Sequence, residues 1–149
     1  YSCASLLSRQ PRTEDKAIAS YKRADMEKRR SIISNSGADI VLSIHQNSNT
    51  NRSHFGPMVY YAKGSEKGER MATILQTAMN KGLGSDVVRS ARIGDFWILN
   101  SGSMPCVLIE CGFISNPNEE YLLRSSEHHE KLADMILMCT IEYFYNMQE

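Results

Sequence analysis

The features that most constrain the fold are two short apolar runs. Each is followed by a polar residue that can serve as a catalytic group or a metal ligand. Residues 40–44 (Ile-Val-Leu-Ser-Ile) lead into His45, and residues 107–109 (Val-Leu-Ile) lead into Glu110. Short, β-branched, unbroken runs of this kind are typical of parallel strands that are covered on both faces. Because functional crevices form at the carboxyl ends of parallel strands, an imidazole and a carboxylate are predicted to meet at one edge of the sheet.

Helical patterns alternate with these strands. We expect a helix over 21–36 that stops at Asn35-Ser36-Gly37, and a second helix that Ser65 caps and that ends near Gly82 and Gly84. A strand is expected at 57–61, and the first 20 residues read as a strand end followed by a surface loop. The last helix carries one apolar stripe, formed by Leu132, Met135, Ile136, Cys139 and Tyr143. The pattern predicts a single α/β domain over residues 1–149, with a mainly parallel sheet flanked by helices.

Charge and composition exclude some classes of function. The 149 residues carry 17 basic and 17 acidic side chains, so no overall field draws the chain to nucleic acid or anionic lipid. No apolar run approaches the about 20 residues that span a bilayer. The chain begins at Tyr1 with no leader pattern, and a signal or anchor upstream is left open.

The other reactive residues have plain structural explanations. Cys106 and Cys111 lie five positions apart on one strand and therefore on opposite faces, so we expect them to be core residues. A cysteine hydrolase that pairs Cys111 with His45 remains an alternative. His54 either lines a groove or is exposed, and His128 with His129 is expected on the surface. Residues 115–119 fit a helix start, in which Asn116 is the cap, Pro117 the first residue, and Glu119 reaches back to the cap.

The two leading candidates also have structural alternatives. A histidine after a strand can serve only as a hydrogen-bonded structural residue, and a glutamate beside a buried strand can pair with an arginine. No HExxH motif and no second His–carboxylate cluster accompanies His45 and Glu110. Their arrival at one edge from two strands is what favours a functional interpretation.

Four stretches resemble one known family in the right order. Residues 38–47 (Ala-Asp-Ile-Val-Leu-Ser-Ile-His-Gln-Asn) and 105–117 (Pro-Cys-Val-Leu-Ile-Glu-Cys-Gly-Phe-Ile-Ser-Asn-Pro) are similar to the two long signatures of the N-acetylmuramoyl-L-alanine amidases of the amidase-3 family. Residues 25–29 resemble that family's helix upstream of the first signature, and residues 56–61 resemble the strand after it. The signatures look closest to the spore-cortex branch.

The resemblance implies an activity and a site. Members hydrolyse the amide between N-acetylmuramic acid and L-alanine in bacterial peptidoglycan, outside the cytoplasm, at the cell wall or as secreted enzymes. His45 corresponds to the last ligand of a His–Glu–His zinc site, and Glu110 to the catalytic glutamate. Asn47, two residues beyond His45, is expected to contact polar groups of the substrate.

The family's first zinc histidine and its zinc glutamate have no counterpart here. We expect both upstream of Tyr1, so that residues 1–149 form the C-terminal part of a single catalytic domain and the chain alone is inactive. A protein activator is left open. The rival hypothesis is a metal-free module that binds peptidoglycan or regulates another protein, and that has lost its metal site.

Overall fold

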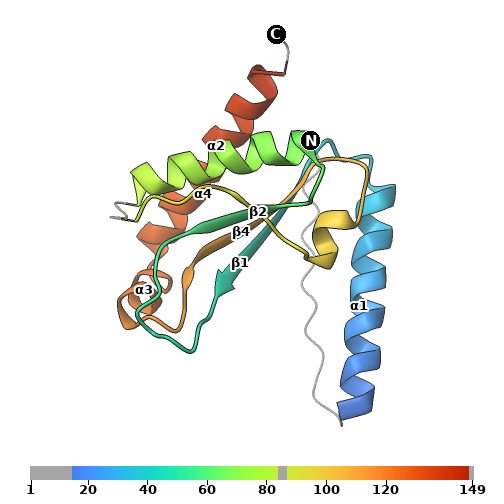
Figure 1. Cartoon of the computed structure of the whole chain (residues 1–149), viewed down its shortest axis with the longest axis horizontal. Helices are drawn as coiled ribbons and strands as arrows, with labels where there is room; N and C mark the ends of the chain where they lie inside the picture. Colours follow the sequence, from blue (N-terminus) through green and yellow to red (C-terminus); the bar gives the residue numbers. More distant parts are fainter. Residues whose placement is uncertain (1–14, 84–86, 148–149) are drawn as a thin grey trace.

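The computed structural model describes residues 15–83 and 87–147, which form a four-stranded sheet with helices on both faces (Figure 1). Along the chain the elements are α1 (Asp15–Asn35), β1 (Val41–Asn47), β2 (Met58–Tyr61), α2 (Glu66–Gly82), β3 (Arg92–Ile93), the 3-10 turn η1 (Trp97–Asn100), β4 (Cys106–Phe113), α3 (Pro117–Leu122) and α4 (Ser126–Tyr145). The α/β class predicted from the sequence is confirmed. In this part of the chain no helix is both long and apolar enough to cross a membrane.

The sheet is mixed, with the strand order β1-β4-β2-β3. β1 pairs parallel with β4, β2 pairs antiparallel with β4, and β3 pairs parallel with β2. A parallel return needs a crossover of a dozen or more residues, usually a helix, and the segment between β1 and β2 contains no helix. β2 therefore runs opposite to β1, and hence opposite to β4.

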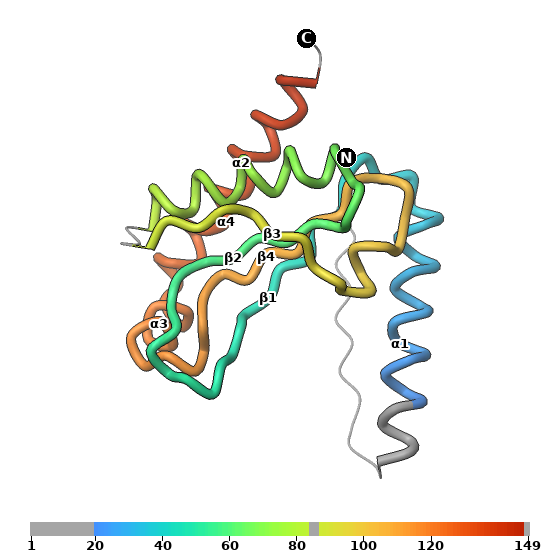
Figure 2. The backbone as a smooth tube through the Cα atoms, in the orientation of Figure 1, coloured from blue at the N-terminus to red at the C-terminus, as the bar shows by residue number. Residues whose placement is uncertain are grey.

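Two separate cores form because β4 is buried on both faces. α2 and α4 cover one face, and η1 lies on the other with α1 packed against it, as the trace in Figure 2 also shows. The larger core contains Val59, Val107, Ile109 and Cys111 of the sheet with Met71, Leu75, Met79, Ile136 and Tyr143 of the helices. The smaller core contains Ala62, Leu99, Cys106 and Leu108. Cys106 and Cys111 are free thiols in different cores, as their spacing predicted.

β1 differs from the expectation of a strand covered on both faces. In the described part of the chain β1 pairs with a neighbour on one side only, and Ile44 is 60% exposed. The apolar run predicts the strand correctly. It does not reveal whether the strand lies inside the sheet or at its edge, where its side chains are less fully covered. The strand covered on both faces is β4.

Element boundaries follow local signals where these exist. Ser65 caps α2 by accepting from the Gly68 amide, and Gly37, at φ 62°, follows the end of α1. The first helix begins at Asp15, six residues before the predicted start, so the loop predicted for the first 20 residues is wrong from residue 15 onward. Few apolar residues mark that first turn, so periodicity could not extend the helix. Residues 1–14 lie outside the described part.

Candidate functional site

His45 and Glu110 stand directly opposite each other in the register of β1 and β4. Side chains at paired positions of adjacent strands project from the same face, so the imidazole and the carboxylate are neighbours. The sequence prediction that two strands bring them to one edge is confirmed by this register. Their chemical roles stay predictions.

Glu110 lies in a setting that favours the protonated carboxyl group. Its Oε2 atom is buried, and among the described residues it has no hydrogen-bond partner. Burial raises the pKa of Glu110, and the charge of His45 lowers it to a smaller extent. No described arginine pairs with this carboxylate, so the ion-pair alternative is not supported. A buried oxygen that lacks a partner is available to a proton or a ligand.

His45 is exposed, and its Nε2 atom lies 2.9 Å from Oγ of Ser43. The two residues are two positions apart and therefore share a face of β1. This contact orients the ring, although the tautomer determines which group donates. Sequence reasoning overlooked Ser43, which the alternation of the strand would have identified as the nearest polar neighbour.

Asn47 ends β1 where the register with β4 shifts. Its carbonyl oxygen accepts from the Ile114 amide at 2.8 Å, and its side-chain Oδ1 accepts from the Ser48 amide at 2.8 Å. Between His45 and Asn47 the partner positions advance from Glu110 to Phe113, so the extra residue lies in β4. The Asn47 side chain is thus held close to the site by its own turn.

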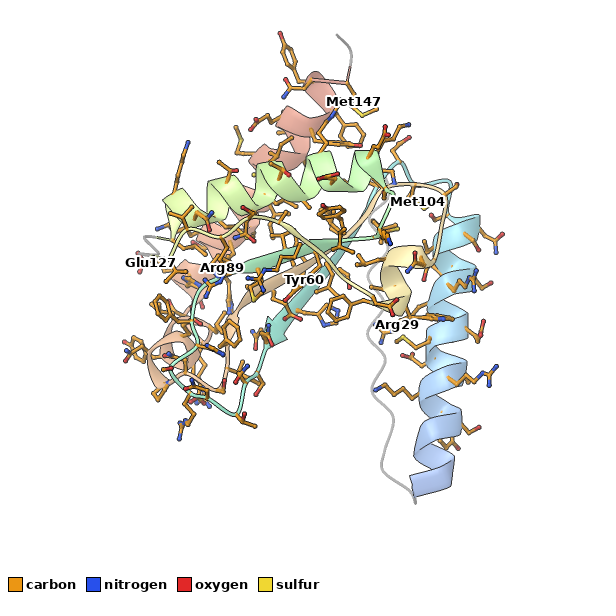
Figure 3. The ribbon with its side chains drawn as sticks, viewed as in Figure 1. Arg29, Tyr60, Arg89, Met104, Glu127 and Met147 are labelled. Carbon is orange, nitrogen blue, oxygen red and sulfur yellow. The ribbon has the colours of Figure 1, made fainter. Side chains whose placement is uncertain are left out.

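Aromatic residues lie on the same face of the sheet as Glu110. Met58 is the β2 residue opposite Glu110, and Tyr60, labelled in Figure 3, lies two positions along on that face. The Tyr60 ring packs edge-on against Phe96, with 5.1 Å between the ring centroids. Burial raises the pKa of the Tyr60 hydroxyl. Phe96 is 38% exposed, so this border of the site is both apolar and accessible.

The helix start at α3 forms as predicted, with one difference. Asn116 accepts from the amides of Asn118 and Glu119, and Pro117 is the first helical residue. Glu119 does not reach back to the cap: its Oε1 accepts from the Gly56 amide at 2.8 Å, and its Oε2 accepts from the Phe113 amide at 2.7 Å. Local motifs could not show this, because Gly56 is 63 positions away in sequence.

The cysteine alternative does not fit the geometry. Cys111 faces the core opposite to the side of Glu110, and burial together with the Glu110 charge raises the pKa of its thiol to about 11. A thiol with that pKa is not ionised near neutral pH and is a poor nucleophile.

The three remaining histidines differ in their surroundings. The sequence predicts His128 on the surface, but it is half-buried, and burial lowers its pKa. His129 is exposed, with Nε2 2.7 Å from the Leu123 carbonyl oxygen. His54 is exposed, and its ring centroid lies 5.9 Å from that of Phe113.

The donor types at the site are ones that zinc accepts. An exposed imidazole is a common zinc ligand, and a buried, unpartnered carboxylate oxygen stands opposite it. No group of three or more histidine, cysteine, aspartate or glutamate residues gathers within 15–83 and 87–147. The described residues therefore suit zinc in kind but supply too few donors to hold it alone.

Comparison with known proteins identifies relatives of one kind. The amidase-3 family, described as N-acetylmuramoyl-L-alanine amidase, matches residues 9–139. The chain is 28% identical over 129 residues to the germination-specific N-acetylmuramoyl-L-alanine amidase of Bacillus subtilis, covering 87% of the chain and 54% of that protein. It is 30% identical over 109 residues to the amidase LytC of the same organism, covering 72% of the chain and 22% of LytC.

A solved structure shows the same fold over nearly the whole chain. The CwlD amidase of Clostridioides difficile, determined in complex with the GerS lipoprotein, superposes with a TM-score of 0.83 at 26% identity. The match covers 97% of this chain and 72% of the CwlD chain. The chain thus spans about half the length of the germination-specific relative and about three quarters of the CwlD structure.

Proposed function

The chain belongs to the N-acetylmuramoyl-L-alanine amidase family, and on that premise we propose that its site hydrolyses the amide between N-acetylmuramic acid and L-alanine in bacterial peptidoglycan. One observation carries the proposal beyond family membership. Glu110 keeps a buried, unpartnered carboxylate oxygen directly opposite an exposed imidazole. A purely structural glutamate in a central strand would be expected to have a hydrogen-bond partner.

Glu110 acts as general base and then as general acid in this proposal. An amide is a poor electrophile, so the attacking water must lose a proton as its oxygen bonds to the carbonyl carbon. The carboxylate takes that proton at Oε2 and returns it to the nitrogen of L-alanine as the C–N bond breaks. The raised pKa of Glu110 suits both steps, because the base is stronger and the acid still transfers its proton near neutral pH.

His45 is proposed as one ligand of a zinc ion. When bound, zinc would polarise the amide carbonyl and lower the pKa of its water to roughly 7. Ser43 holds the ring through the 2.9 Å contact at Nε2, which leaves Nδ1 as the other ring nitrogen for a ligand. The further histidine and glutamate ligands are proposed to lie outside the described residues, with residues 1–149 forming the C-terminal part of one catalytic domain.

Asn47 is proposed to contact polar groups of the glycan or stem peptide. Its Oδ1 is engaged by the Ser48 amide, so its side-chain NH₂ group is the one that faces a ligand. We also propose action outside the cytoplasm, because several relatives are named cell wall amidases. Similarity to a germination-specific amidase supports a role in spores, and the CwlD complex with a lipoprotein supports a protein partner.

Hydrolysis tests the proposal against its rival, a metal-free module that binds peptidoglycan. The full-length polypeptide, loaded with one equivalent of zinc, is incubated with purified peptidoglycan, and new L-alanine amino termini are counted. We expect release by the wild type, loss of release in Glu110→Ala and His45→Ala, and full release in Glu130→Ala, an exposed glutamate on α4. Wall binding without release by the zinc-loaded wild type would establish the rival.

A further inference from the structure

We propose that Glu119 is a positioning residue: its carboxylate ties the loop after β1 to the end of β4 and thereby holds Asn47 beside Glu110. The inference rests on the proposed function for the roles of those two residues. It rests on the structure alone for the tie between the two segments. We call residues 47–56 and 113–119, with the contacts between them, the clamp.

The Glu119 carboxylate bridges the two segments of the clamp. Oε1 accepts from the Gly56 amide at 2.8 Å, and Oε2 accepts from the Phe113 amide at 2.7 Å. Hydrogen bonds from backbone amides to an ionised carboxylate are shorter and about twice as strong as neutral ones. The two oxygens of this side chain thus accept from backbone amides of two segments, the loop before β2 and the end of β4. Capping α3 requires neither bond.

Three further hydrogen bonds join the same two segments. The Ile114 amide donates to the Asn47 carbonyl at 2.8 Å, and the Asn49 amide donates to Ser115 Oγ at 2.9 Å. Nε of Arg52 donates to the Ser115 carbonyl at 3.0 Å. In Figure 2 the loop after β1 and the loop after β4 run together toward α3. Since residues 48–56 contain no helix or strand, these contacts give that loop its order.

The clamp acts at the place where the ladder is weakest. Glu110 pairs with His45, but the next pair is Phe113 with Asn47, because β4 holds an extra residue between them. A bulge interrupts the ladder and leaves a residue unpaired. The amide of Phe113, just past the bulge, is held by Glu119. Without that bond the end of β4 that fixes Asn47 relative to Glu110 loses one of its anchors.

Gly112 makes room for this arrangement. A Cβ atom at residue 112 would lie 3.2 Å from Oε1 and 3.3 Å from Cδ of Glu119. Such a contact is tight enough to displace the carboxylate, which two hydrogen bonds hold in place. Glycine within the bulge therefore permits the close approach that the bridge requires.

Backbone hydrogen exchange tests the tie without reference to activity. In Glu119→Gln one amide oxygen still accepts, while the NH₂ group faces a second donor. We expect exchange at Gly56 and Phe113 to accelerate more than about tenfold, the effect of losing one charge-assisted bond. The amides of Asn49 and Ile114, which Glu119 does not touch, should accelerate as well. Glu120→Gln, which removes only a half-exposed partner of Arg124, should leave all four amides unchanged.

Kinetics test the positioning. In the zinc-loaded full-length protein, Glu119→Gln should lower kcat about tenfold or more with a smaller change in KM, because misplacement of reacting groups acts on the chemical step. Gly112→Ala, which keeps the carboxylate but crowds it, should change exchange and kcat in the same direction by less. If Glu119→Gln unfolds the protein, Gly112→Ala provides the same measurements.

The outcomes separate the two proposals. Faster exchange confined to Gly56 and Phe113, or faster exchange at all four amides with kcat unchanged, overturns the positioning role. A wild type that releases no amino termini overturns the proposed function instead. In that case the exchange at Asn49 and Ile114 still decides whether Glu119 holds the clamp.

Discussion

Replacement of Gln76 should change stability strongly, because its side-chain amide bonds to backbone groups of β2 and its flank that β3 does not reach. Its Oε1 accepts from the Val59 amide at 2.8 Å, and its Nε2 donates to the Pro57 carbonyl at 3.2 Å and to Asn80 Oδ1 at 3.0 Å. β3 pairs only with the last two residues of β2, so the preceding backbone groups on that edge depend on Gln76. The side chain is 1% exposed, so water does not substitute for it.

Replacement by leucine keeps the volume and removes the amide. Two backbone groups then lose their partners, and a buried unsatisfied group costs about 1–3 kcal/mol. Gln76→Leu should therefore lower the free energy of unfolding by about 2–6 kcal/mol, a large part of the about 5–15 kcal/mol typical of a domain. At about 2–4 °C per kcal/mol for a chain of this size, the melting temperature should fall by about 10 °C.

Thermal and urea unfolding, followed by circular dichroism, measure this change. Thr77→Leu, the exposed neighbour on α2, is the matched control and should shift stability by less than about 0.5 kcal/mol. A Gln76→Leu protein as stable as the wild type would refute the reasoning, because it would show that β2 does not need the amide.

Four further predictions concern Glu110, Cys111 and Gly37. Because burial raises the pKa of Glu110, the acid limb of kcat/KM should lie above the pH at which an ordinary glutamate ionises, and Glu110→Gln should lower kcat by about 10²–10⁴. The raised pKa also means that protonated Glu110 favours folding at low pH, and that this contribution is lost as pH rises through the folded pKa. The melting temperature of Glu110→Gln, measured relative to that of the wild type, should therefore rise between acid and neutral pH. Because burial raises the pKa of the Cys111 thiol to about 11, this residue should resist iodoacetamide at neutral pH in the folded protein. Cys111→Ala should keep hydrolysis. Rapid labelling would contradict the placement of Cys111 in the core. Gly37→Ala should cost about 1–2 kcal/mol in urea unfolding, because φ is 62° there, and an unchanged midpoint would argue against that conformation.

The parts of the structure that the sequence predicts are those with local signals. Strand ends at His45 and Glu110, the caps Ser65 and Asn116, and the opposite faces of the two strand cysteines all follow from spacing and residue type. The antiparallel course of β2 requires knowing that no helix connects it to β1. The short, polar stretch between the two strands is the sequence signal for that course.

The features that the sequence does not predict are long-range. The sequence predicts a local capping role for Glu119, yet its partner Gly56 lies 63 positions away. Gln76 is a polar residue within the apolar stripe of α2, which is a signal, but its partners lie on β2. In both cases a polar side chain bonds to backbone that lacks a strand partner. Composition and periodicity describe which face a residue occupies, not which distant amide it meets.

The two central residues of the site differ in how much of their environment the described chain supplies. Glu110 lies on β4, which is paired on both sides, and its side chain projects from the same face of the sheet as Met58. Burial among the described residues raises its pKa. His45 lies on β1, which in the described part is paired on one side, and its ring is exposed with only Ser43 as a partner. One imidazole gives a weak zinc site, whereas a buried carboxylate needs no metal to be a stronger base. Substitutions in the cores around β4 should therefore act on proton transfer, and substitutions along β1 should act on metal binding.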